Sequence, residues 1–393
     1  MMQGGGWLQK AAGKGVRALF GLVVLVLGIC GFFTVPASLT DYPVVLPKEG
    51  EPRWARGAFH VHSTRSDGRG SPLAVARAAK AAGLDFVVLT DHNDFTPPAP
   101  TWVDGVLLVP GVEISTSAGH LVAFGMERPL AGMQRWMPAG DAVRAVHEAG
   151  GMTVLAHPVQ RHNPWTDEQT AREAKGFELY SADTFFRHAM SHPMSRLLPA
   201  VGAYFAKPEH GVMVLVAPEP GPGERFMELS SAESKLAFCA HDAHGLPSYE
   251  SVFNSLATYL PPAQAPLPLP ADAKAAALVV TNALRGGSAV CAFRALGEPE
   301  GFALEGMDAE RREAHVGEVL KVRLPGIADA EKVRVQVWGA GRLGPDGTSV
   351  ELTGEGVARV EVWVQGPGRF FGSEWRPWIV PSPVRVLPRG PGI

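Results

Sequence analysis

Short apolar runs alternate with helix-like segments over the first two thirds of the chain. The runs that read as strands are AFHVH (58–62), FVVLTDH (86–92), VLLVPGVEIS (106–115), HLVAFG (120–125), MTVLAHP (152–158), GFELYS (176–181) and LAFCAHDAH (236–244). Between the first two, SPLAVARAAKAAG predicts a helix with Ser71 as its N-cap, Pro72 at its first position and Gly83 at its end. Alternating strands and helices predict a mostly parallel sheet covered by helices, and their number favours a barrel.

The pattern changes near Glu298. The segments VLKVRL, KVRVQVWGAG, ARVEVWVQG and WIVPSPVRVL alternate apolar and polar residues between Gly, Pro and Asp, which is typical of antiparallel strands. We therefore predict a barrel domain over residues 54–297 and a small all-β, sandwich-like domain over 298–393. Residues 182–235 interrupt the barrel pattern and are interpreted as an insertion.

The apolar run ALFGLVVLVLGICGFFTV, residues 18–35, is long enough to cross a membrane and follows three basic residues. Basic residues before the run predict that the rest of the chain lies outside the cytoplasm. The run is longer than the apolar core of most cleaved signals, which favours a retained anchor over a signal peptide, although both stay open. We expect an anchor or signal over residues 1–40, a linker over 41–53, and an anchored or exported catalytic domain.

The composition is that of a folded globular chain, with 46% hydrophobic and 19% charged residues among 393. A formal net charge of −3 and the absence of a long basic block argue against binding to duplex nucleic acid, and favour a small-molecule substrate. Cys239 and Cys291 lie in apolar runs and are predicted to be free thiols of the core. On this reading the cysteines do not indicate a cellular compartment.

Histidines and carboxylates gather at the ends of the predicted strands. His60 and His62, at positions i and i+2, are expected to point to one face, but such a pair equally fits two polar residues at a strand end. The same placement recurs at four further strands, with His92, Glu113, His157, and the pair Asp242 and His244. Because the carboxyl ends of barrel strands open onto one face, these residues predict a metal cluster.

Two further candidates come from turns. The segment VEISTSAGHLV reads as a hairpin that places His120 across from Glu113, and glycines flank Asp67 in the loop after His62. Nine candidate ligands result: His60, His62, Asp67, His92, Glu113, His120, His157, Asp242 and His244. Imidazole and carboxylate without thiolate suit zinc, manganese or iron, and nine ligands exceed what one tetrahedral ion needs.

The motifs HVHSTRSDG, LTDHND, PGVEIS, GHLVAFG, LAHP and HDAHG, in this order and spacing, resemble the PHP (polymerase and histidinol phosphatase) metallohydrolases over about residues 54–295. The resemblance implies a distorted (β/α)7 barrel that holds two or three divalent ions and hydrolyses phosphoesters. It also implies three ligand sets: His60, His62, Glu113 and Asp242; Glu113 as a bridge with His120 and His157; and Asp67, His92 and His244.

We therefore expect a phosphomonoesterase or phosphodiesterase in which a hydroxide bridging two ions attacks phosphorus. Glu113 and Asp242 are the predicted catalytic residues, with Asp242 moving the proton. Arg65, Arg161 and His162 are the candidates for binding the substrate phosphate.

Two alternatives stay open at this point. The same cluster suits hydrolysis of a carboxylic ester, carbamate or amide. A non-catalytic, membrane-anchored module that binds metal or a partner is the other alternative. Two neighbours of the ligands are not predicted to bind metal: His241 has the opposite strand parity to Asp242, and Asp91 is expected to bond local backbone.

Overall fold

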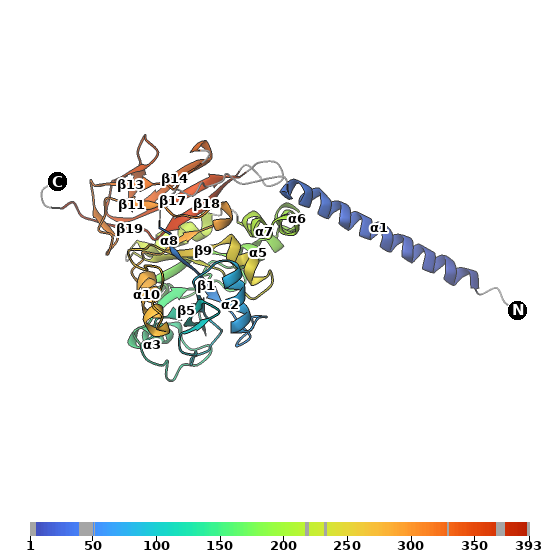
Figure 1. The fold of residues 1–393 in the computed structure, drawn as a ribbon, viewed down its shortest axis with the longest axis horizontal. Coiled ribbons are helices and arrows are strands. Elements are labelled where there is room, and N and C mark those ends of the chain that lie inside the picture. The colour runs from blue at the N-terminus through green and yellow to red at the C-terminus, as the bar shows by residue number, and fades with distance from the viewer. Residues whose placement is uncertain are drawn as a thin grey trace.

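A computed structural model describes residues 5–38, 50, 52–216, 220–231, 234–327, 330–366 and 374–390 of the chain. Most of the predicted linker, residues 41–53, lies outside the described residues. The helix α1 (Gly5–Ser38) contains the apolar run 18–35 and extends away from the rest of the chain (Figure 1). In the described parts of the chain no helix is both long enough and apolar enough to cross a membrane, so the predicted membrane-spanning segment is not supported.

The central sheet is built from the strands that the apolar runs predict. They are β1 (Ala55–Val61), β2 (Phe86–Leu89), β4 (Val106–Thr116), β5 (Gly119–Phe124), β6 (Met152–Leu155), β7 (Gly176–Ser181) and β8 (Leu236–Ala240), neighbours in this order. Pairing is parallel except on both sides of β5. The sheet curls back on itself where the end of β8 meets β1. There the backbone N–H of His241 donates to the carbonyl of Phe59, and the backbone N–H of His62 donates to the carbonyl of Ala243, each at 3.0 Å.

Aromatic side chains fill the inside of this barrel. The ring of Phe59 on β1 lies 4.8 Å from that of Phe238 on β8 and 5.6 Å from that of Phe124 on β5, measured between centroids. All three are buried. Because these strands lie on different sides of the barrel, the rings form a packed interior below the strand ends.

Helices surround the barrel strands, among them α2 (Pro72–Ala81), α3 (Ala139–Glu148), α4 (Glu168–Glu173), α9 (Tyr249–Ser255) and α10 (Ala273–Arg285) (Figure 1). The predicted start of α2 is confirmed: the backbone N–H of Ala74 donates to the Ser71 hydroxyl, and Pro72 is the first helical residue. Gly83 follows the helix with a φ of +69°, a conformation that glycine adopts without strain.

The insertion over residues 182–235 is helical. It comprises α5 (Ala182–Met190), the π-helix η1 (Pro193–Leu197), α6 (Leu198–Ala206), α7 (Pro208–Leu215) and α8 (Pro220–Ser230). Because α5 begins directly after β7, at the end of the barrel where the predicted ligands lie, the insertion contributes to that end. Its helix α6 also packs against α1 (Figure 1).

The strands near the C-terminus extend the barrel sheet. Beyond β1 the order is β9 (Ala257–Leu260), β10 (Val290–Ala292), β18 (Trp375–Pro381), β17 (Gly356–Gln365), β19 (Val384–Leu387) and β12 (Glu313–His315), while β14 (Val333–Gly339) also pairs with β17. A second sheet contains β11 (Ala303–Glu305), β13 (Val319–Arg323), β16 (Ser349–Leu352) and β15 (Gly341–Leu343). The fold is thus mixed α/β, consistent with a barrel plus a C-terminal sheet, and the boundary at residue 298 stays a prediction.

The cysteine prediction is wrong. Cys239 on β8 and Cys291 on β10 form a disulfide, with Cα atoms 5.8 Å apart. The barrel closure places β8 beside β1, while β9 connects β1 to β10, so two residues separated by 52 positions meet. Apolar periodicity shows that each cysteine is buried but carries no information about this long-range meeting.

Candidate metal centre

The ligand-bearing strand ends are bent by unusual backbone conformations. His60, His157 and Asp242 have positive φ values of 63°, 30° and 44°. This left-handed region costs a non-glycine residue on the order of 1–3 kcal/mol, so the surrounding structure has to hold these residues in place. At His60 the bend interrupts the regular alternation of β1, whose pairing register with β2 shifts between Ala58 and Val61. Both His60 and His62 can therefore face the mouth of the barrel above Phe59.

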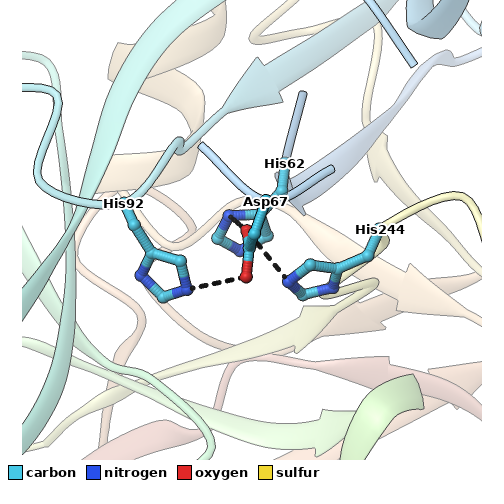
Figure 2. A group of neighbouring side chains, drawn as sticks. All are labelled: His62, Asp67, His92 and His244. Carbon is cyan, nitrogen blue, oxygen red and sulfur yellow. Dashed lines mark ion pairs between the residues drawn. The ribbon is translucent and has the colours of Figure 1, made fainter. Parts of the chain in front are cut away.

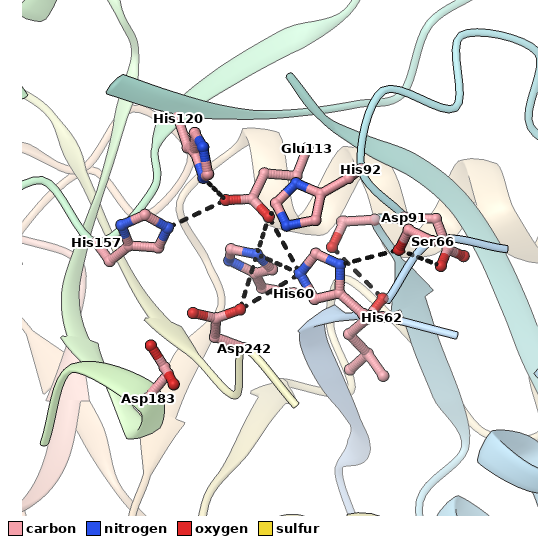
Figure 3. Close-up of polar contacts among 12 residues, drawn as sticks. His60, His62, Ser66, Asp91, His92, Glu113, His120, His157, Asp183 and Asp242 are labelled. Atoms are coloured by element: carbon pink, nitrogen blue, oxygen red, sulfur yellow. Dashed lines mark hydrogen bonds and ion pairs between the residues drawn. The ribbon is translucent and has the colours of Figure 1, made fainter. Parts of the chain in front are cut away.

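The first group of ligands is His60, His62, Glu113 and Asp242 (Figure 3). The Nε2 atoms of His60 and His62 lie 3.1 Å apart, and each lies 3.1 Å from Oε2 of Glu113. Oδ1 of Asp242 lies 3.4 Å from the first nitrogen and 3.3 Å from the second. All four side chains are buried. Two imidazoles and two carboxylates thus converge on one point.

Glu113 is shared between this group and its neighbours. Its other oxygen, Oε1, lies 2.8 Å from Nδ1 of His120 and 3.1 Å from Nε2 of His157. His120 reaches this position because β4 and β5 form the predicted hairpin, but the predicted pairing is wrong by two residues: Ser115 lies opposite His120, and Val122 lies opposite Glu113. The two oxygens of Glu113 therefore face different sets of imidazoles, which is the arrangement that a bridging carboxylate requires.

A second, more exposed group of candidate ligands contains Asp67, His92 and His244 together with His62 (Figure 2). Oδ2 of Asp67 lies 3.6 Å from Nε2 of His92, while Oδ1 lies 3.4 Å from Nε2 of His244 and 3.5 Å from Nδ1 of His62. His62 thus borders this group as well as the first one, which the sequence did not predict. All nine candidate ligands lie together in the structure.

The donor atoms fit divalent cations. Oε2 of Glu113 is buried and lies within 3.2 Å of nitrogens of His60, His62 and His92, yet it accepts no hydrogen bond from the described residues. In the first group, the atoms that would bind an ion lie within 4.8 Å of one another. A buried carboxylate oxygen facing several imidazole nitrogens without a hydrogen bond is the environment that a metal ion completes.

The charges in the cluster agree with this fit. Burial favours neutral carboxyl groups, but the neighbouring histidines outweigh it and hold the pKa of Glu113 and of Asp242 well below their usual range. Burial likewise lowers the pKa of His62 and of His157, but the carboxylates of Asp242 and Glu113 beside His62, and the hydrogen bond of His157 to Glu113, raise each pKa to about 9. Protons and metal ions therefore compete for the same imidazoles.

Glu178 is a functional residue that the sequence analysis missed. It is buried on β7, its Oε1 lies 2.6 Å from Nδ1 of His60, and its Oε2 accepts the backbone N–H of His157 at 2.7 Å. A carboxylate on the far nitrogen of a ligating histidine fixes the ring and its tautomer. The available signal was a single Glu in the otherwise uncharged strand GFELYS.

A second missed set comes from the insertion. Asp183 on α5 lies near Asp242 (Figure 3). It accepts hydrogen bonds from Nε2 of Gln160, at 2.8 Å, and from Nε of Arg187. The hydrogen bond to Asp183 raises the pKa of Arg187, and the charges of Asp242 and Asp67 add to this effect. A guanidinium group therefore lies near the metal cluster.

The residues predicted to bind phosphate are engaged elsewhere or exposed. Nε of Arg65 donates to Asp94 at 2.7 Å, and Nη1 of Arg161 contacts the hydroxyl of Ser191 at 3.5 Å. His162 is exposed. Their role in substrate binding stays a prediction.

Neither residue predicted to be a non-ligand belongs to the groups that could hold a metal ion, but Asp91 bonds Ser63, 28 positions away, and not its local backbone as predicted. His241 is buried away from the cluster: the backbone N–H of Phe59 donates to its Nδ1, and its Nε2 lies 2.8 Å from the carbonyl of Leu256. Burial lowers its pKa to about 4. Asp91 accepts hydrogen bonds from the backbone N–H and the hydroxyl of Ser63, at 2.7 and 2.8 Å, and so fixes the loop after His62.

No protein-family model matches the chain, and no curated protein matches it. Among solved structures, a two-domain protein from Bacteroides vulgatus that contains a predicted PHP-like metal-dependent phosphoesterase is 15% identical, with 87% of this chain and 98% of that chain covered at a TM-score of 0.39. An amidohydrolase from Chromobacterium violaceum is 16% identical, covering 48% and 87% at a TM-score of 0.31. The lesion-specific endonuclease PfuEndoQ from Pyrococcus furiosus is 15% identical, covering 53% and 52% at a TM-score of 0.33. At these values the likenesses establish neither a family nor an activity for this chain.

Proposed function

We propose that this protein is a metal-dependent hydrolase of phosphoesters. The observation that carries the proposal is the carboxylate of Glu113, which is shared among imidazoles from four strand ends. When bound, divalent ions at such a cluster supply an activated water at neutral pH and neutralise charge that develops on phosphoryl oxygens. The residues that would hold the ions are the nine ligands described above, in agreement with the PHP-like motifs.

The protein's own groups divide the remaining work. Asp242 is the carboxylate that would accept the proton of the attacking water, because its Oδ1 faces the His60 and His62 nitrogens that would hold an ion. Glu178 orients the ring of His60 and the backbone at His157, which keeps two ligands in fixed positions. Burial of the first ligand group keeps bulk water away from the inner side of the site.

Arg187 favours a phosphoester over a carboxylic ester or amide as the substrate. Its Nε is held by Asp183, and the described residues include no hydrogen-bond partner for its two terminal nitrogens. A guanidinium group presents paired N–H donors that match two oxygens of a phosphoryl group, whereas a neutral carbonyl substrate offers no such anion. We therefore propose that Arg187 binds a non-bridging phosphoryl oxygen.

Metal analysis combined with a substrate screen tests the proposal. We expect two or three divalent ions per chain, turnover of a phosphomonoester or phosphodiester, and loss of that turnover after chelation. D242N should reduce turnover at least about a hundredfold, because it removes a proton acceptor, and metal analysis of the variant separates this loss from the loss of an ion. The matched control is D104N, which alters an exposed carboxylate paired with Arg77. Fewer than two ions together with no phosphoester turnover, or turnover of carboxylic esters only, would contradict the proposal.

A further inference from the structure

A cavity of about 490 Å³ adjoins the metal cluster on its outer side. Three ligands form one part of its wall: Asp67, His92 and His120. The remaining wall consists of Ser66, Asn93, Ser115, Arg135 and Trp136. Its volume is within the range of small-molecule sites, so a substrate whose phosphoryl group lies at the cluster has room there for its leaving group.

The loop that carries Trp136 is fixed to the wall of this cavity. After β5 the chain returns to the hairpin, where the backbone N–H of Trp136 donates to the carbonyl of Ser115 at 2.7 Å. Ser115 is itself held by Asn93, whose amide oxygen accepts the Ser115 N–H and whose amide nitrogen donates to its hydroxyl. The backbone of Ser115 and the side chain of Asn93 thus fix the position of the loop.

Trp136 is held in a conformation that packing does not explain. Its φ is +65°, in the left-handed region that a bulky residue rarely adopts, and its side chain is 58% exposed. Most large apolar side chains in the described barrel are buried. The ring of Trp136 is exposed, and it therefore contributes little to the core. A strained backbone and an exposed aromatic ring at a cavity beside metal ligands are typical of a ligand-binding position.

Arg135 adds a charge to the same wall. Its guanidinium carbon lies 5.3 Å from the centre of the Trp136 ring, which is within the range of a cation–π contact. The contact restrains the indole and places a positive charge beside it. The cavity wall beside the candidate ligands therefore includes a flat, polarised aromatic surface.

We propose that Trp136, restrained by Arg135, forms a leaving-group subsite that selects phosphoesters with a planar aromatic ring. The inference rests on the proposed function and adds a substrate class to it. The phosphoryl group lies at the cluster, and the aromatic part of the substrate stacks on the indole in the cavity. Stacking requires a planar π-face, so a saturated ring of the same size binds less well.

Benzyl phosphate and cyclohexylmethyl phosphate test this selection, because they differ in ring aromaticity while both leave as primary alcohols. We expect the wild-type protein to prefer benzyl phosphate in kcat/KM by about tenfold, a typical effect of one stacked ring. In W136A the ratio of kcat/KM for benzyl phosphate to kcat/KM for cyclohexylmethyl phosphate should be close to one. W136F should keep most of the preference for benzyl phosphate. F205A is the matched control, since Phe205 is exposed on α6 and does not line the cavity; its ratio should equal that of the wild type.

The possible results separate the subsite from the function. A wild-type ratio near one, or an unchanged ratio in W136A with a folded protein, overturns the subsite while phosphoester hydrolysis stands. If the metal-loaded wild-type protein hydrolyses neither benzyl phosphate, cyclohexylmethyl phosphate nor any other phosphoester, the proposed function is wrong, and the proposed subsite is then wrong as well. Circular dichroism of W136A and the activity of W136F distinguish lost stacking from lost folding.

Discussion

Glu178 and His60 are joined inside the barrel by a contact of 2.6 Å between Oε1 of the carboxylate and Nδ1 of the imidazole. Both side chains are fully buried, so the carboxylate determines which nitrogen of the ring carries the proton. The nitrogen left over, Nε2, is the one that faces Glu113 and Asp242. A residue outside the ligand set therefore controls a ligand.

E178Q should weaken metal binding by about 10- to 100-fold, because the amide keeps the shape but loses the charge that makes His60 a strong ligand. Competition with a chelator of known affinity measures the change. E250Q, at an exposed position on α9, is the control and should leave affinity unchanged. Equal affinities for E178Q and the wild type would show that Glu178 does not act through His60.

R187A should weaken competitive inhibition by inorganic phosphate by about tenfold, because a charge-assisted pair with a phosphoryl oxygen is lost. R187K should recover part of the effect, since it restores the charge without the fork geometry. The control is R77A, which removes an exposed arginine paired with Asp104. An inhibition constant that R187A leaves unchanged would assign phosphate binding to another group.

His241 should make the protein sensitive to acid. Its pKa is about 4 in the folded chain, below the ordinary value of 6.5, so between these values the unfolded state binds more protons. Stability from this residue is therefore present above pH 6.5 and is lost as the pH falls towards 4, by up to about 3 kcal/mol.

H241Q removes this titration while its amide keeps a donor for the carbonyl of Leu256 and an acceptor for the N–H of Phe59. Chemical unfolding at pH 7 and pH 4.5 should show a smaller loss of unfolding free energy in H241Q than in the wild type. Identical losses would mean that acid sensitivity arises from other groups.

The disulfide between Cys239 and Cys291 should be present in the folded protein and contribute to its stability. Peptide mapping without reductant should find the two cysteines linked. The double variant C239A/C291A should unfold with about 4 kcal/mol less free energy, because a loop of 52 residues is no longer closed in the unfolded chain. Two separate thiol peptides from protein that was never reduced would contradict the pairing.

The sequence alone predicted the parts of this protein that depend on local order. Apolar runs and period-two alternation predicted the strands, and the N-cap at Ser71 predicted the start of α2. Because the carboxyl ends of barrel strands share one face, position along each strand was sufficient to predict seven of the nine candidate ligands. The other two, His120 and Asp67, were predicted from a hairpin pattern and from a loop with flanking glycines.

Contacts between residues distant in sequence were decided only by the tertiary structure. Glu178 reaches His60 across 118 positions, and Cys239 reaches Cys291 across 52, because barrel closure and the added strands bring separate segments together. Arg187 and Trp136 come from an insertion and a loop that the pattern of strand ends does not place at the site. Strict alternation along β1 would also place His60 on the face opposite Phe59. The positive φ of His60 and the register shift beside it turn the side chain towards the mouth of the barrel instead. The order of apolar and polar residues along the sequence shows which residues share a helix or strand, whereas the folded backbone determines which helices and strands meet.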